Sequence, residues 1–121
     1  MKMFIYLTLI VFSLSAVLGF IVLSNLLKSG NTRKLFVFLH GILAGIGIVT
    51  LVIWISFEED LKILIPLGFF CVAAFLGSIL FIRDLMLETP GPVWLAKIHP
   101  VFSILGILSL LYILILKLTT L

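Results

Sequence analysis

The chain has 121 residues, of which 64% are hydrophobic and only 11% are charged, and its formal net charge is +3. Its mean hydropathy of +1.46 is too high for a water-soluble globule and is typical of a protein that folds in a lipid bilayer. The connectors between the apolar stretches are short, which leaves no room in this sequence for a separate soluble catalytic domain. We therefore expect an all-α membrane protein whose main surroundings are lipid, with no nucleic-acid partner.

Each of four apolar stretches reaches the roughly 20 residues that a helix needs to cross a ~30 Å hydrocarbon layer. The first predicts a helix over residues 3–28. Lys2 and the apolar residues after it look like a secretory signal, but the apolar run continues to Leu27, well beyond the core of such a signal. We expect this segment to be a transmembrane helix that ends at Ser29 and Gly30.

A second helix is expected over residues 33–57. Asn31 or Thr32 is positioned to cap its first turn, because short polar side chains accept hydrogen bonds from the unpaired N–H groups there. The acidic residues 58–60 end this helix and form the second connector.

The third helix is expected over residues 61–87, with Asp60 as its cap. Pro66 lies too deep in this span for a first-turn proline. It therefore either kinks the helix or delays the start of the regular helix until about Ile65. Residues 89–92, with the sequence Thr-Pro-Gly-Pro, mark a tight turn.

The fourth helix is expected over residues 99–118. Proline is favoured at the first helical position, so Pro100 would place His99 at the mouth of this helix. Residues 93–98 would then form an interfacial segment anchored by Trp94.

Basic residues predict the orientation in the membrane, because loops rich in lysine and arginine stay in the cytoplasm. Three basic residues belong to the second connector and the two termini: Lys2, Lys62 and Lys117. Five lie in or beside the first and third connectors: Lys28, Arg33, Lys34, Arg83 and Lys97. We expect a multi-pass protein of the cell (inner) membrane, with the first and third connectors in the cytoplasm and both termini outside.

The two halves of the chain resemble each other. One register of the second half against the first aligns His40 with His99 and Gly47 with Gly106. A register that differs by a single position aligns residues 15–21 with residues 73–79, at four identities in seven. Each copy contains two spans, so the second copy enters the membrane from the same side as the first.

This pattern predicts a single membrane domain of two tandem parallel helical hairpins, about residues 1–58 and 60–121. In the up-down-up-down bundle that they would form, the second and fourth helices are diagonal partners, so equivalent residues on them can face each other across the centre.

Each histidine stands at the head of a stripe of small residues on one helix face. Ala44 and Gly47 follow His40, and Ser103 and Gly106 follow His99. The stripes have two interpretations. Small residues let helix backbones approach closely, or they leave a slot for a flat apolar cofactor.

A b-type haem would suit such a slot, because two imidazoles can take the opposed axial positions on its iron. Its propionates would need cations, and Arg33, Lys34 and Lys97 are expected at the same end as both histidines. The predicted cofactor-binding residues are therefore His40 and His99 as iron ligands, Ala44, Gly47, Ser103 and Gly106 as the slot, and Arg33, Lys34 and Lys97 as the cations.

Paired histidines on nonadjacent spans, in the pattern His40-x6-Gly47 and His99-x6-Gly106, resemble those of small four-helix transmembrane b-type cytochromes with bis-histidine haem. The resemblance implies one haem b, with His40 and His99 as axial ligands, electron transfer with membrane quinone, and, if the chain is an enzyme, a haem-dependent oxidoreductase. No nucleophile accompanied by a base is evident, so no other catalytic residue is predicted.

The alternative is a noncatalytic small subunit or assembly factor with structural histidines, packed against a larger membrane complex or copies of itself. A closed zinc or copper site is disfavoured, because no carboxylate or thiol accompanies the histidines.

Overall fold

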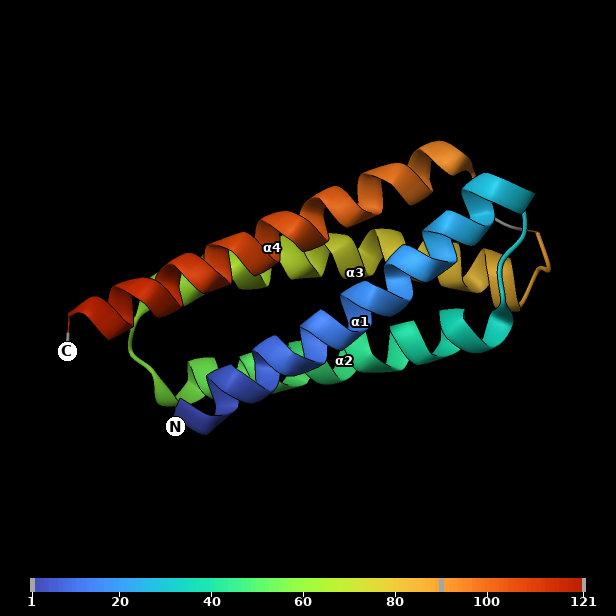
Figure 1. Cartoon of the computed structure of the whole chain (residues 1–121). Coiled ribbons are helices and arrows are strands. Elements are labelled where there is room, and N and C mark those ends of the chain that lie inside the picture. The colour runs from blue at the N-terminus through green and yellow to red at the C-terminus, as the bar shows by residue number, and fades with distance from the viewer. Residues whose placement is uncertain (1, 90, 121) are drawn as a thin grey trace.

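The computed structural model describes residues 2–89 and 91–120 and contains four long α-helices. They are α1 (Lys2–Ser29), α2 (Lys34–Phe57), α3 (Leu64–Leu85) and α4 (Val93–Thr119), with a short 3-10 turn, η1 (Leu61–Ile63), before α3. Each span is long and apolar enough to cross a membrane, and the described residues contain no strand. The predicted all-α fold with four membrane-spanning helices is confirmed (Figure 1).

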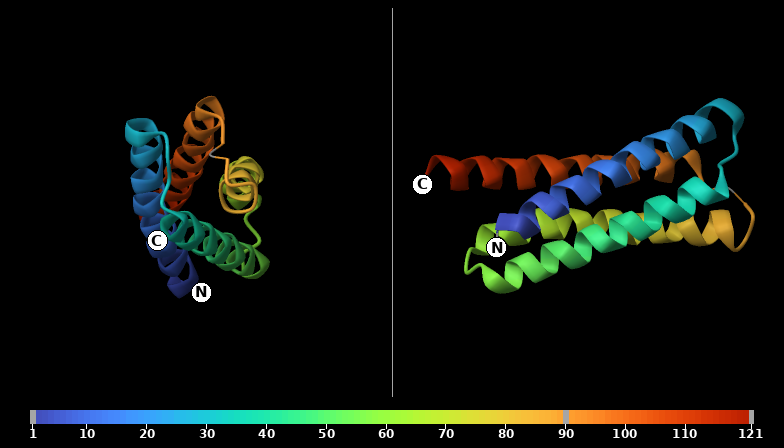
Figure 2. Two further views of the ribbon diagram at one scale, coloured as in Figure 1. Left: turned by 90° about the vertical axis from the view of Figure 1, so that its right-hand side faces the viewer. Right: turned by 60° about the horizontal axis from the view of Figure 1, so that its bottom comes forward.

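Successive helices run in opposite directions and form the up-down-up-down bundle that the sequence predicts. The closest packing is within the pairs α1–α2 and α3–α4, while α2 also packs on α3 and α1 touches α4 less extensively. The α2 and α4 helices are diagonal partners (Figures 1 and 2). The first and third connectors lie at one end of the bundle, and the second connector, the start of α1 and the end of α4 lie toward the other (Figure 1).

The start of the fourth helix differs from the sequence-based prediction. The α4 helix begins at Val93 rather than at His99, and Pro100 lies inside it. Pro92 ends the turn and its carbonyl accepts the N–H groups of Leu95 and Ala96, so the first turn forms before Pro100 is reached. Proline then removes one helical hydrogen bond without ending the helix.

Of the two predicted helix caps, the one at Asp60 is confirmed and the one at Asn31 or Thr32 is not. Asp60 accepts a hydrogen bond from the backbone N–H of Lys62, and the regular helix begins at Leu64, which agrees with the delayed start predicted from Pro66. Arg33 is the N-cap residue of α2 and makes no side-chain cap. Thr32 donates its hydroxyl hydrogen instead to the carboxylate of Asp84, a residue of the other hairpin.

The buried hydrophobic cluster of the bundle consists of four pairs of equivalent positions. The registers that align α1 with η1–α3 and α2 with α4 relate all of its members: Ile5 and Ile63, Phe12 and Phe70, Leu51 and Leu110, Trp54 and Ile113. Lys117 and Glu58, which are also equivalent in the register of α2 and α4, form an ion pair at the end of the bundle nearest the second connector. The core that joins the hairpins is therefore built from equivalent residues of both.

Leu51→Ala and Leu110→Ala are expected to destabilise the bundle by similar amounts, roughly 2–5 kcal/mol each, because both leucines are 0% exposed and each substitution would leave a cavity. Leu108→Ala is the matched control on a side chain that is 56% exposed, and its effect is expected to be small. Equilibrium unfolding in detergent micelles measures the free energy of unfolding of the three variants. If Leu108→Ala and Leu110→Ala lowered the free energy of unfolding by equal amounts, this assignment of the core would be wrong.

Candidate functional site

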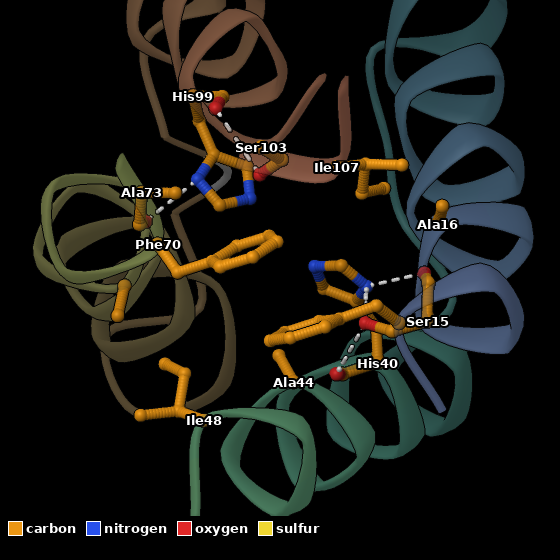
Figure 3. A pocket seen from close by; sticks show the side chains of 12 residues that line it. Ser15, Ala16, His40, Ala44, Ile48, Phe70, Ala73, His99, Ser103 and Ile107 are labelled. Atoms are coloured by element: carbon orange, nitrogen blue, oxygen red, sulfur yellow. Dashed lines mark hydrogen bonds between the residues drawn. The ribbon is translucent and has the colours of Figure 1, made fainter. Parts of the chain in front are cut away.

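The two histidines of the chain meet at the centre of the bundle, in the half nearer the first and third connectors. The ring centres of His40 on α2 and His99 on α4 are 6.0 Å apart, and the ring planes are nearly perpendicular, at 88°. Both rings line a cavity among all four helices (Figure 3). The diagonal facing of equivalent residues that the sequence predicts is therefore present in the structure.

Each imidazole is tied to the neighbouring helix of its own hairpin by the same contact. The Nδ1 atom of His40 lies 2.8 Å from the carbonyl oxygen of Ser15, and Nδ1 of His99 lies 2.8 Å from that of Ala73. A carbonyl oxygen can only accept, so Nδ1 carries the proton, and in the neutral ring Nε2 keeps its lone pair. The contacts therefore fix both the orientation and the tautomer of each ring.

The two Nε2 atoms point toward each other across the cavity (Figure 3). Within the described part of the chain, neither makes a hydrogen bond. Two lone pairs thus converge on one space. A metal held linearly between two imidazoles, at roughly 2 Å from each nitrogen, would place the ring centres about 6 Å apart. The observed separation is suited to that arrangement.

Glycines make room for the imidazoles on α1 and α3. A Cβ atom at Gly19 would lie 2.8 Å from Cε1 of His40, and a Cβ atom at Gly77 would lie 2.9 Å from Cε1 of His99. Both distances are too short for ordinary contact. The rings can therefore lie against the neighbouring helix only because these positions have no side chain.

The floor of the cavity is a pair of stacked phenylalanines. The rings of Phe12 and Phe70 are 3.9 Å apart at their centres and nearly parallel, at 8°. They cover Gly47 and Gly106, where a Cβ would lie 2.7 and 2.8 Å from the respective ring. These two glycines therefore pack against aromatic side chains and do not line the cavity, in contrast to Ala44 and Ser103, which do.

The predicted cations Arg33, Lys34 and Lys97 lie on exposed positions outside the cavity lining. Lys34 forms a 3.0 Å ion pair with Glu88, and the guanidinium of Arg33 lies over the ring of Phe36. The structure keeps them at the end of the bundle nearer the histidines but does not bring them into the site.

Sequence reasoning missed the phenylalanine floor and the backbone carbonyls that hold the histidines. The signal for the floor was present, because the register that aligns residues 15–21 with 73–79 also pairs Phe12 with Phe70. The carbonyl contacts have no side-chain signature, so no pattern of residue types indicates them.

The cavity is small. Its volume is about 60 Å³, on a scale where one water needs roughly 10–15 Å³. Typical pockets for larger ligands measure roughly 300–1,000 Å³. The space as it stands fits an ion or a few waters, and a porphyrin would require the hairpins to separate or the phenylalanine pair to turn aside.

Comparisons with protein-family models, with curated proteins and with solved structures find no match for this chain. The interpretation of the site therefore depends on its geometry and chemistry.

Gly19→Ala and Gly77→Ala are expected to destabilise the bundle, because the new methyl group would collide with an imidazole that its carbonyl bond holds in place. Gly45→Ala is the control, since a Cβ there meets nothing within 4 Å, and alanine should be neutral or stabilising by up to about 1 kcal/mol. Thermal unfolding in detergent compares the unfolding temperatures of the three variants with that of the wild type. If Gly45→Ala lowered the unfolding temperature as much as Gly19→Ala, the destabilisation would come from the change in the helix itself and not from a collision with the histidine.

Proposed function

We propose that this chain is a membrane electron carrier that holds one haem b between His40 and His99. The observation that supports this most is the convergence of two Nε2 lone pairs from diagonal helices, with each Nδ1–H tied to a backbone carbonyl. Histidine ligands of metals almost always donate their other N–H to such an acceptor, which fixes the ring and strengthens its donation. A chain with two histidines can supply both axial ligands of one haem and of no more than one.

Each part of the site has a role in this proposal. His40 and His99 would bind the iron through Nε2, and the carbonyls of Ser15 and Ala73 would hold the imidazoles in place. The haem, when bound, would supply reversible one-electron chemistry. Ala44 and Ser103 would pack against the faces and edge of the ring.

The surroundings of the histidines also suit a one-sided electron-transfer site. On the side of the second connector, the buried cluster that includes Leu51, Leu110 and Trp54 separates the cavity from water. The cations Arg33, Lys34 and Lys97 lie toward the opposite end, where propionates would extend. Electron exchange would then occur near the first and third connectors, and a lipid-soluble quinone is the partner we propose.

Binding of a porphyrin would require a change in the packing of the bundle. Phe12 and Phe70 line the same cavity as the two imidazoles, so a bound porphyrin would have to move this pair aside or move the hairpins apart. The alternative function, a noncatalytic subunit or assembly factor, is favoured by this closed packing. It predicts that the cavity holds only water.

We further propose that the first and third connectors face the cytoplasm and that both termini lie outside, in the cell (inner) membrane. The excess of basic residues beside those two connectors supports this orientation.

The purified protein from haem-replete expression is expected to be red, with a Soret band, an absorbance that corresponds to one haem per chain, and a low-spin spectrum. His40→Ala and His99→Ala should each remove at least about nine-tenths of the bound haem, because a five-coordinate haem loses one of its two anchors. Absorption spectra and haem quantification measure both effects.

Ser78→Ala is a suitable control, because the Ser78 hydroxyl is exposed and bonds only to the Ala74 carbonyl of its own helix. It should keep wild-type haem content. A colourless wild-type protein after haem-replete expression and after addition of free haemin would contradict the cytochrome proposal and support the noncatalytic alternative.

Orientation can be tested by cysteine labelling in a Cys71→Ser background. A cysteine in place of Glu59, in the second connector, should react with a membrane-impermeant maleimide on intact cells, and a cysteine in place of Asn31, in the first connector, should react only after lysis. Both native side chains are exposed, so access is limited by the membrane alone. The reverse pattern would show that the chain is inserted the other way.

A further inference from the structure

The cavity between the hairpins is suited to a bare ion in the packing that the structure shows. Nε2 of His40 and Nε2 of His99 face each other across it, and the ring centres are 6.0 Å apart (Figure 3). This separation matches a linear nitrogen–metal–nitrogen unit in which each nitrogen is roughly 2 Å from the ion. Such a unit needs space only along the line between the two nitrogens, and the cavity volume of about 60 Å³ provides it. The hairpins and the phenylalanine pair would not have to move.

The angle between the rings also agrees with an ion that has two ligands. The imidazole planes are nearly perpendicular, at 88°. A linear site fixes the direction of each lone pair but leaves each ring free to rotate about that direction, so perpendicular planes are compatible with it. More ligands would require further donors, and the part of the chain that the structure describes contains no group of three or more histidine, cysteine or acidic side chains placed to hold a metal. The coordination number that these side chains offer is therefore two.

The lining of the cavity favours a singly charged ion. Apart from the imidazoles and the hydroxyls of Ser15 and Ser103, the described residues that line it are alanine, isoleucine and phenylalanine, with no carboxylate or thiol among them. The free energy needed to move an ion out of water increases with the square of its charge, so a divalent ion with no anionic ligand is strongly disfavoured here. Imidazole is a good ligand for copper, and Cu⁺, with its filled d shell, accepts two ligands in a line.

Both imidazoles are already oriented for such an ion. The Nδ1–H of each ring bonds to a backbone carbonyl, that of Ser15 or Ala73, at 2.8 Å, which leaves the lone pair on Nε2. A ring that is held through its second nitrogen keeps its orientation and donates more strongly to a metal. Gly19 and Gly77 make room for the rings in this position. All four helices therefore contribute to a site that is preorganised.

We propose that His40 and His99 form a two-coordinate site for Cu⁺ in the haem-free protein. This inference does not rest on the proposed haem, because it concerns the closed packing, in which a porphyrin is not accommodated. Haem and Cu⁺ would exclude each other, since each histidine has a single Nε2 lone pair. The bound ion would join the two hairpins through the diagonal helices α2 and α4.

The first experiment titrates haem-free protein in detergent, with Cys71→Ser in every sample because Cys71 is an exposed free thiol that would bind the same ion. Cu⁺ is supplied from a coloured chelator under anaerobic, reducing conditions, and absorbance measures its transfer to the protein. We expect one Cu⁺ per chain. His40→Ala and His99→Ala should each weaken binding at least about tenfold, because one of the two ligands is lost. Ser78→Ala should bind Cu⁺ as its parent does.

Three results of this titration would overturn the proposal. Two Cu⁺ per chain would show that the histidines bind separately, and an affinity that survives the loss of either histidine would show that the ion is held elsewhere. An excess of Zn²⁺ should leave the bound Cu⁺ in place, so its displacement by Zn²⁺ would contradict the preference for a singly charged ion.

The second experiment leaves both histidines unchanged, so it does not depend on whether their variants fold. Ag⁺ is a substitute for Cu⁺ that does not change oxidation state, and its natural isotopes have nuclear spin one-half. One equivalent added to protein with ¹⁵N-labelled histidine should shift and split the Nε2 resonances of both histidines, while both Nδ1 atoms keep their protons. Splitting at one histidine alone, or at neither, would overturn the shared site.

These results are distinct from the test of the proposed function, which uses the Soret band of protein from haem-replete expression. A colourless wild type that binds Ag⁺ through both histidines would contradict the cytochrome proposal and support the Cu⁺ site. A red wild type whose haem-free form binds no Ag⁺ would support the cytochrome proposal and overturn the Cu⁺ site.

Discussion

The structure depends on one contact made twice, the hydrogen bond from a histidine Nδ1 to the backbone carbonyl of the preceding helix. A helical carbonyl is normally engaged within its own helix, and it can receive an imidazole only where the two backbones come close. Gly19 and Gly77 provide that closeness, because any side chain there would collide with the ring. In a bilayer, apolar side chains are surrounded by lipid before the helices associate, so the hydrophobic effect does not drive the helices together. Specific association then depends on close packing at small residues and on hydrogen bonds between helices.

From this contact the remaining geometry of the site follows. With Nδ1 directed outward to α1 or α3, Nε2 of each ring must face the centre of the bundle, and the diagonal placement of α2 and α4 brings the two nitrogens into opposition. The stacked Phe12 and Phe70 close the space below. This pair thereby separates the two imidazoles from the rest of the buried cluster on the side of the second connector.

Much of this arrangement could be predicted from the sequence, for reasons that differ between residues. His40 and His99 are conspicuous because imidazoles are rare in apolar spans, and their spacing exposes the repeat. Phe12 and Phe70 are not conspicuous, since lipid-facing and core-facing residues are equally apolar here and periodicity has little contrast. The start of α4 was predicted too late because Pro100 is ordinary at a first helical position, while the cap that Pro92 provides has no side-chain signal. The cations at Arg33 and Lys97 were located at the correct end, but sequence alone cannot say how far a long side chain reaches.

The central proposal is that the two Nε2 atoms would bind one haem iron, and low-temperature electron paramagnetic resonance of the oxidised, haem-loaded protein tests this proposal most directly. Two histidine ligands whose planes are close to the observed 88° should give a highly anisotropic low-spin ferric signal, and replacement of either histidine should abolish it. A high-spin signal in the wild type, or a low-spin signal that survives the loss of His99, would contradict the account.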